Sequence, residues 1–86
     1  MANPVVSTLT ADTWTKIQTS VQKGTVYNML PGQRVFQTLR ATGQAAPTGD
    51  TEKVIMPDKW DLDIASAADV YVFSPDSAGK VRSDFI

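Results

Sequence analysis

Residues 69–73 constrain the fold of this chain more than any other stretch, because they place large apolar side chains on both faces of one segment. Their Val, Tyr and Phe content favours a strand, in which successive side chains point to opposite faces. Val70 and Val72 then share one face, and Tyr71 and Phe73 share the other. One thin sheet cannot cover both faces, so we expect either a partner or the N-terminal segment to cover the second face.

Segments of similar β-forming character recur along the chain between turns rich in Gly and Pro. The predicted strands are residues 13–18, 25–30, 34–40, 54–56, 61–65, 69–73 and 80–86. For the first of these, a helical turn capped by Thr10 or Asp12 is the alternative. The pattern predicts an all-β fold, namely a small β-sandwich or partly open barrel of six to seven short antiparallel strands.

The turns between these segments have recognisable chemistry. Pro31-Gly32 suits a type II turn and predicts a hairpin between residues 25–30 and 34–40. In the first of these strands Val26, Asn28 and Leu30 share one face. The small residues 65–69 predict a turn, and Pro75 with Gly79 predicts another.

We expect one domain, because 86 residues are too few for two. Residues 1–12 form an extended N-terminal arm, and residues 13–86 form a single β domain with a long loop at 41–52. A chain of this length buries only roughly 60–65% of its unfolded surface. A partner that binds only the folded form would therefore add useful stability.

Composition argues against several functions. The chain has neither Cys nor His, which removes thiolate metal sites and the commonest general base. Eight basic residues are scattered against nine acidic ones, so nucleic-acid binding is not expected. No apolar run approaches the ~20 residues of a membrane span, and the N-terminus does not read as a signal peptide.

Candidate chemistry is sparse, and we predict no enzymatic activity, metal or cofactor. Asp58, Asp61 and Asp63 could offer oxygen ligands to Ca²⁺, but a solvated strand face explains them better. Two S-x-x-K stretches lack the partner motifs of the enzymes that use this spacing. Trp14 and Trp60 could stack on a sugar, although core packing is the simpler interpretation.

Three stretches carry a family resemblance. TWTKIQTSVQKGTVYNM, RVFQTLRATGQAAPTG and DVYVFSPDSAGKVRSDFI, in this order, resemble small virion proteins encoded among the structural genes of tailed bacteriophages. The matching residues are 13–49 and 69–86. The resemblance implies a structural protein of the particle, and first of all a capsid decoration (cement) protein. A tail, neck or fibre-attachment component and a carbohydrate-binding virion surface module are the alternatives.

The resemblance also implies partners and a location. We expect binding to the major capsid protein or another virion protein, and a homo-oligomer that could be a trimer. The expected location is the capsid surface of the virion, after assembly in the host cytoplasm. The predicted contact residues lie in the arm, the long loop and the last two strands: Asn3, Pro4, Val5, Val6, Leu9, Thr42, Gln44, Pro47, Tyr71 and Ile86.

Overall fold

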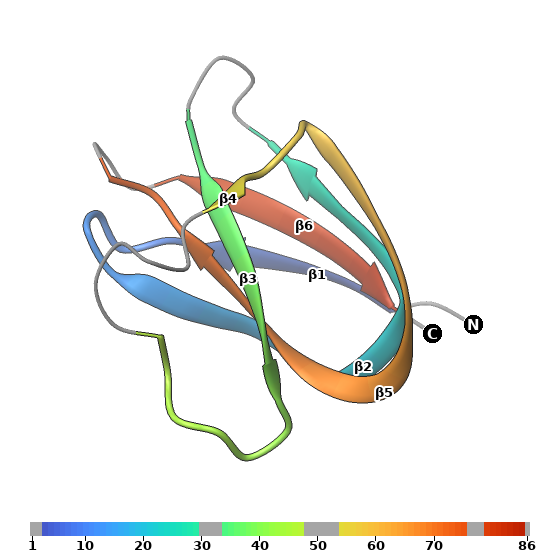
Figure 1. The fold of residues 1–86 in the computed structure, drawn as a ribbon. Coiled ribbons are helices and arrows are strands. Elements are labelled where there is room, and N and C mark those ends of the chain that lie inside the picture. The colour runs from blue at the N-terminus through green and yellow to red at the C-terminus, as the bar shows by residue number, and fades with distance from the viewer. Residues whose placement is uncertain (1–2, 30–33, 48–53, 76–78, 86) are drawn as a thin grey trace.

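The computed structural model describes residues 3–29, 34–47, 54–75 and 79–85, and within these ranges the chain contains strands but no helix. The strands are β1 (Asn3–Thr8), β2 (Trp14–Asn28), β3 (Phe36–Ala41), β4 (Val54–Ile55), β5 (Lys59–Phe73) and β6 (Lys80–Phe85). They form one antiparallel sheet in the order β1-β6-β2-β5-β3-β4, which is not closed into a barrel (Figure 1). The all-β, antiparallel prediction is confirmed, and β1 and β4 are the two edges.

Strands β2 and β5 are longer than the sequence predicts, with 15 residues each. The expected strand over residues 13–18 is confirmed, but it continues without a break into the strand expected at 25–30. The expected turn at residues 65–69 is wrong, because these residues continue β5. Their side chains are small enough to follow a sharp bend without crowding, so low bulk here marks curvature rather than chain reversal.

The bend arises where β2 and β5 lose their regular register. The pairing shifts between Lys16 and Gln18, between Gln18 and Val21, and between Val21 and Lys23. Extra residues in one strand of a pair kink it and increase its twist. Ser20 lies at this point with φ of 55°, a left-handed conformation that non-glycine residues seldom adopt. The long strands therefore curl, and β3 crosses in front of β6 and β1 (Figure 1).

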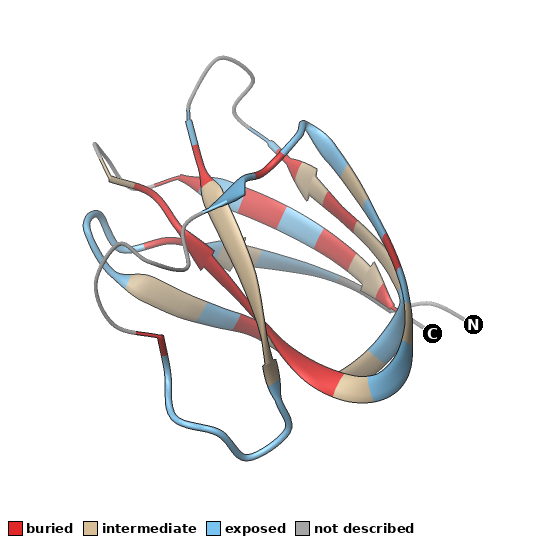
Figure 2. Cartoon of the chain, viewed as in Figure 1, coloured by how far each residue is buried: buried red, intermediate tan, exposed pale blue. Residues whose placement is uncertain are grey.

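Figure 2 colours all buried residues red, polar ones included, and among them the folded-over sheet encloses one apolar core. Its buried members come from both halves of the sheet: Leu9, Ile17, Val26, Val35, Met56, Leu62, Val70, Val72, Val81 and Phe85. A polar contact also joins the first part of β2 to β6, because the Gln18 amide donates to the hydroxyl of the buried Ser83 at 2.9 Å. In β6, Val81, Ser83 and Phe85 alternate with more exposed residues and are all buried, as expected for a strand with one face toward the core.

The predicted hairpin between residues 25–30 and 34–40 is wrong. β2 pairs with β5 and β6, whereas β3 pairs with β4 and β5. The Pro31-Gly32 turn itself lies outside the described residues, as does Leu30. Residues 36–41 pair with residues 68–73 of β5, on the edge opposite β2, whereas residues 25–27 pair with residues 59–61 of β5. Non-local pairing thus overrides the local turn signal.

Residues 69–73 of β5, which carry apolar side chains on both faces, are covered by other parts of the same chain. They lie between β2 and β3, with Val70 and Val72 fully buried on the core side. On the other side Tyr71 is only 4% exposed. The Lys16 ammonium lies 5.9 Å from the centre of its ring. The N-terminal segment is not the cover, because β1 pairs with β6. Burial of Tyr71 therefore requires no second subunit.

Candidate interaction surface

The N-terminal residues predicted to contact a partner form β1, the edge strand beside β6. Val5 is 40% exposed and Val6 is 56% exposed, although both lie in a strand. Asn3 and Pro4 occupy the first two positions of the same strand. Leu9 follows it and is buried in the core, so it anchors β1 rather than offering a surface. The predicted arm is thus part of the sheet, with one long side open.

The hydrogen-bond pattern fixes which backbone groups β1 leaves open. The Leu9 N–H donates to the Gly79 carbonyl at 2.8 Å, which continues the register of the β1–β6 ladder. Bonded and non-bonded pairs alternate in an antiparallel ladder, so the odd-numbered residues of β1 bond to β6. The N–H and C=O of Val6 and Thr8, and the C=O of Pro4, therefore point away from the sheet.

A second hydrogen bond supports this assignment from the other side of β6. The Met29 N–H donates to the Lys80 carbonyl at 3.0 Å. By the same alternation, the even-numbered residues of β6 bond to β2, which leaves the odd-numbered ones to bond β1. Pro4 fits the pattern as well. A proline is tolerated in an edge strand where its missing N–H would have faced away from the sheet.

The opposite edge is much shorter. β4 consists of Val54 and Ile55, which are 59% and 67% exposed. The Met56 N–H donates to the Val35 carbonyl at 2.9 Å, so only Ile55 turns its N–H and C=O outward within β4. A two-residue edge gives a second chain little to pair with. Its two aliphatic side chains are nevertheless the most exposed large apolar groups of the described residues.

The long loop is described as far as Pro47. Of the predicted contact residues in this loop, Thr42 and Gln44 are exposed and Pro47 is buried. The Gln44 N–H donates to the Ala41 carbonyl at 3.0 Å, and Gly43 adopts a φ of 89°. Residues 48–52 of this loop lie outside the described residues, and so does the predicted contact residue Ile86.

Sequence reasoning missed Asp69, which is 1% exposed and ties together three parts of the molecule. Its carboxylate accepts the Ser20 N–H at 3.0 Å and lies 3.5 Å from the Lys16 ammonium. The Ser20 N–H lowers the pKa of Asp69, and the Gly43 N–H and Lys16 lower that pKa further, while burial opposes them. The carboxylate therefore holds the β2 bend as an anion, through the Ser20 N–H and Lys16.

Both tryptophans are half-buried. Trp14 packs on Phe73 with ring centres 5.3 Å apart, and Phe36 packs on the other side of Phe73 at 6.4 Å. Trp60 packs against the apolar core. Strand pairing places Trp14, Phe73, Phe36 and the exposed Ile55 side by side in one row across four strands. These rings pack on one another, as the simpler interpretation of the tryptophans predicts.

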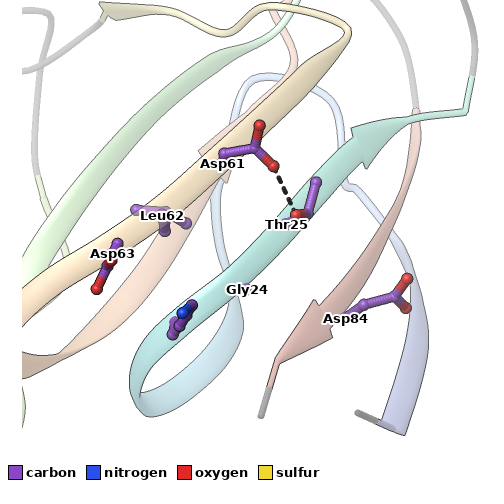
Figure 3. A pocket seen from close by; sticks show the side chains of 7 residues that line it. Gly24, Thr25, Asp61, Leu62, Asp63 and Asp84 are labelled. Atoms are coloured by element: carbon purple, nitrogen blue, oxygen red, sulfur yellow. Dashed lines mark hydrogen bonds between the residues drawn. The ribbon is translucent and has the colours of Figure 1, made fainter.

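Asp61 and Asp63 border a hollow of about 440 Å³ together with Asp84, whereas the third predicted acidic residue, Asp58, does not line it (Figure 3). Asp61, Thr25 and Asp84 lie in one row across β5, β2 and β6, and the Thr25 hydroxyl donates to Asp61 at 2.7 Å. Asp84 forms an ion pair with Arg82 at 3.0 Å. Among the described residues, no three acidic, His or Cys side chains lie close enough to share a metal ion. The geometry thus gives the Ca²⁺ interpretation no support.

Comparison with protein-family models, curated proteins and solved structures returned no match to this chain. Within the described ranges, no helix has the length and apolar character needed to cross a bilayer.

Proposed function

We propose that this chain is a non-enzymatic structural protein of a tailed-bacteriophage particle, and that it decorates the capsid by binding the major capsid protein. One observation carries the structural role. The exposed aliphatic side chains Val5, Val6, Val54 and Ile55 lie on the two edge strands, at opposite limits of an open sheet. Exposed apolar groups at sheet edges are typical of surfaces that meet other chains.

The resemblance of residues 13–49 and 69–86 to small virion proteins supports the choice of assembly. In this proposal the folded-over sheet is a small β-sandwich whose core is complete without a partner. The capsid contact is then made by the β4 edge, where Ile55 is 67% exposed and ends a row of aromatic side chains. A capsid partner would bury these groups and gain roughly 25 cal/mol per Å² of apolar surface.

The proposal is tested by measuring the copy number of this chain in purified virions and its binding to empty heads. We expect a copy number in proportion to the capsid lattice, and tight binding to heads that lack the chain. A few copies per particle would instead indicate the tail, neck or a fibre attachment, and absence from the virion would overturn the proposal.

The contact surface is tested with Ile55→Lys, which places a charge where the proposal requires an apolar contact. We expect this variant to lose at least about tenfold in affinity for heads, because a charge buried without a partner is costly. Thr10→Lys is the matched control, since Thr10 is exposed and lies outside the strands. Equal binding by both variants would exclude the β4 edge.

A further inference from the structure

The open edge of β1 is complementary to itself. It turns outward two donors, the N–H groups of Val6 and Thr8, and three acceptors, the C=O groups of Pro4, Val6 and Thr8. No residue of β1 carries a charge, although charged side chains are a common means of blocking such an edge. We infer that β1 pairs with β1 of a second copy of this chain, antiparallel and about a two-fold axis beside Val6.

The donor pattern favours this register over a shift that sets Pro4 opposite Val6. With Val6 opposite the second copy's Val6, each Val6 N–H meets the other Val6 carbonyl, and each Thr8 N–H meets a Pro4 carbonyl. Every outward donor then has an acceptor. The only outward carbonyl of β1 without a donor is that of Thr8, because it lies opposite Pro4, which has no N–H. A shift that sets Pro4 opposite Val6 leaves the Thr8 donors without a partner in β1.

The charges on β6 slightly favour this register over the next one. Thr8 lies beside Lys80, Val6 beside Arg82 and Pro4 beside Asp84. In the register centred on Val6, Lys80 of one copy and the second copy's Asp84 stand in the same row, roughly 14 Å apart at three strand spacings. Arg82 stands in a row with the second copy's Arg82 at the same spacing. Setting Val6 opposite Thr8 would instead align Arg82 with the second copy's Lys80 in two rows and bring no opposite charges together. At this separation exposed charges are largely screened, so the preference is small and strongest at low salt.

The side chains agree with this pairing. Val6 is 56% exposed in the single chain and would pack directly against its own copy. Val5, 40% exposed, would lie opposite the second copy's Ser7 on the other face. The alternative of β1 pairing with β4 is weaker, because β4 turns outward only the N–H and C=O of Ile55. An isologous dimer follows, with one sheet continuous across both copies.

This inference concerns the free protein and would stand if the chain bound no capsid. It is tested by sedimentation velocity over a range of concentrations, with Val6→Lys and Val6→Asp. Each variant alone places two like charges opposite each other, so the dimer dissociation constant should rise at least about tenfold. An equimolar mixture of the two variants should dimerise again, because residue 6 then faces the opposite charge.

Val54→Lys is the matched control, since Val54 is as exposed as Val6 but lies on the other edge. It should dimerise like the unaltered chain. Circular dichroism and a thermal melt establish that each variant is folded, and Val6→Thr supplies a neutral variant that should remain dimeric. An unaltered chain that stays monomeric at millimolar concentration, a trimer, or a mixture that fails to dimerise would overturn the inference.

Discussion

Strand β1 and residues 69–73 of β5 are both uncharged over most of their length, yet they lie in opposite surroundings. The β5 segment has a strand on each side and is buried on both faces. β1 has a strand on one side only and keeps Val5 and Val6 exposed. Side-chain hydrophobicity alone therefore does not show where a small β protein needs a partner. Unpaired backbone groups at an edge indicate that need more directly.

The largest expected effect is at the buried β5 segment, residues 69–73. Phe73→Ala removes a ring that is 5% exposed and packs between Trp14 and Phe36, so we expect a loss of about 3–5 kcal/mol in the free energy of unfolding. Val6→Ala, at the open edge, should change it by no more than about 0.5 kcal/mol. Urea denaturation measures both. Similar losses would contradict the distinction between centre and edge.

A second change tests the packing between β2 and β6 at Gly24, which lies opposite Phe85. A Cβ added at Gly24 would come within 2.6 Å of the Phe85 ring and would also meet the Asp84 carbonyl. Gly24→Ala should therefore cost about 1–3 kcal/mol through overpacking. Gly43→Ala is the comparison, because an added Cβ there meets no described atom within 4 Å, and only the positive φ opposes it. A neutral Gly24→Ala would contradict this tight packing, since both the Phe85 ring and the Asp84 backbone would then have to move aside.

Asp69 gives the central region a pH dependence that the edge lacks. The Ser20 N–H, the Gly43 N–H and Lys16 lower its pKa below the ordinary value of 3.8. The stabilisation is therefore complete above that ordinary value and is lost as pH falls through the lower pKa of the folded state. Asp69→Asn should be less stable than the unaltered chain at neutral pH.

The free energies of unfolding of the two chains should then converge as the solution is acidified below about pH 4. Chemical denaturation from pH 7 to pH 2 measures this difference. Asp61→Asn is the control, since Asp61 is exposed and accepts only the Thr25 hydroxyl among the described groups. A constant difference between Asp69→Asn and the unaltered chain at every pH would contradict the anionic role.

The smallest expected effect concerns the bend that lets β2 and β5 curl. Ser20 has a φ of 55°, which glycine adopts without steric cost, and its N–H donates to Asp69 whichever side chain is present. Ser20→Gly should change the free energy of unfolding by less than about 1 kcal/mol, in the stabilising direction. Ser20→Val should destabilise the chain. The reverse order in thermal melts would mean that the bend does not depend on this conformation.

Much of the fold follows from local sequence. The strand at residues 80–85, the alternation of Asp61 and Asp63 with Leu62, and the all-β class are visible in period-two patterns. The hairpin at Pro31-Gly32 was wrong because strand pairing is decided by distant segments. The long β2 and β5 were missed for a similar reason, since bulges bend a strand where small residues look like a turn.

The candidate surface was predictable only in part. The aliphatic residues of the N-terminal segment pointed to β1, but which of its backbone groups face outward depends on the register with β6. Asp69 gave no signal, because its partners at Ser20 and Gly43 are backbone N–H groups that any residue except proline provides. Val54 and Ile55 became notable only when β4 proved to be an edge strand.

Amide hydrogen exchange, followed residue by residue with increasing protein concentration, tests the open edge most directly. The amides of Val6 and Thr8 should become protected as copies meet, while that of Ile55 on the far edge should exchange at an unchanged rate. Protection that never reaches Val6 and Thr8, or that appears at Ile55 instead, would contradict the assignment of β1 as the strand through which this chain associates.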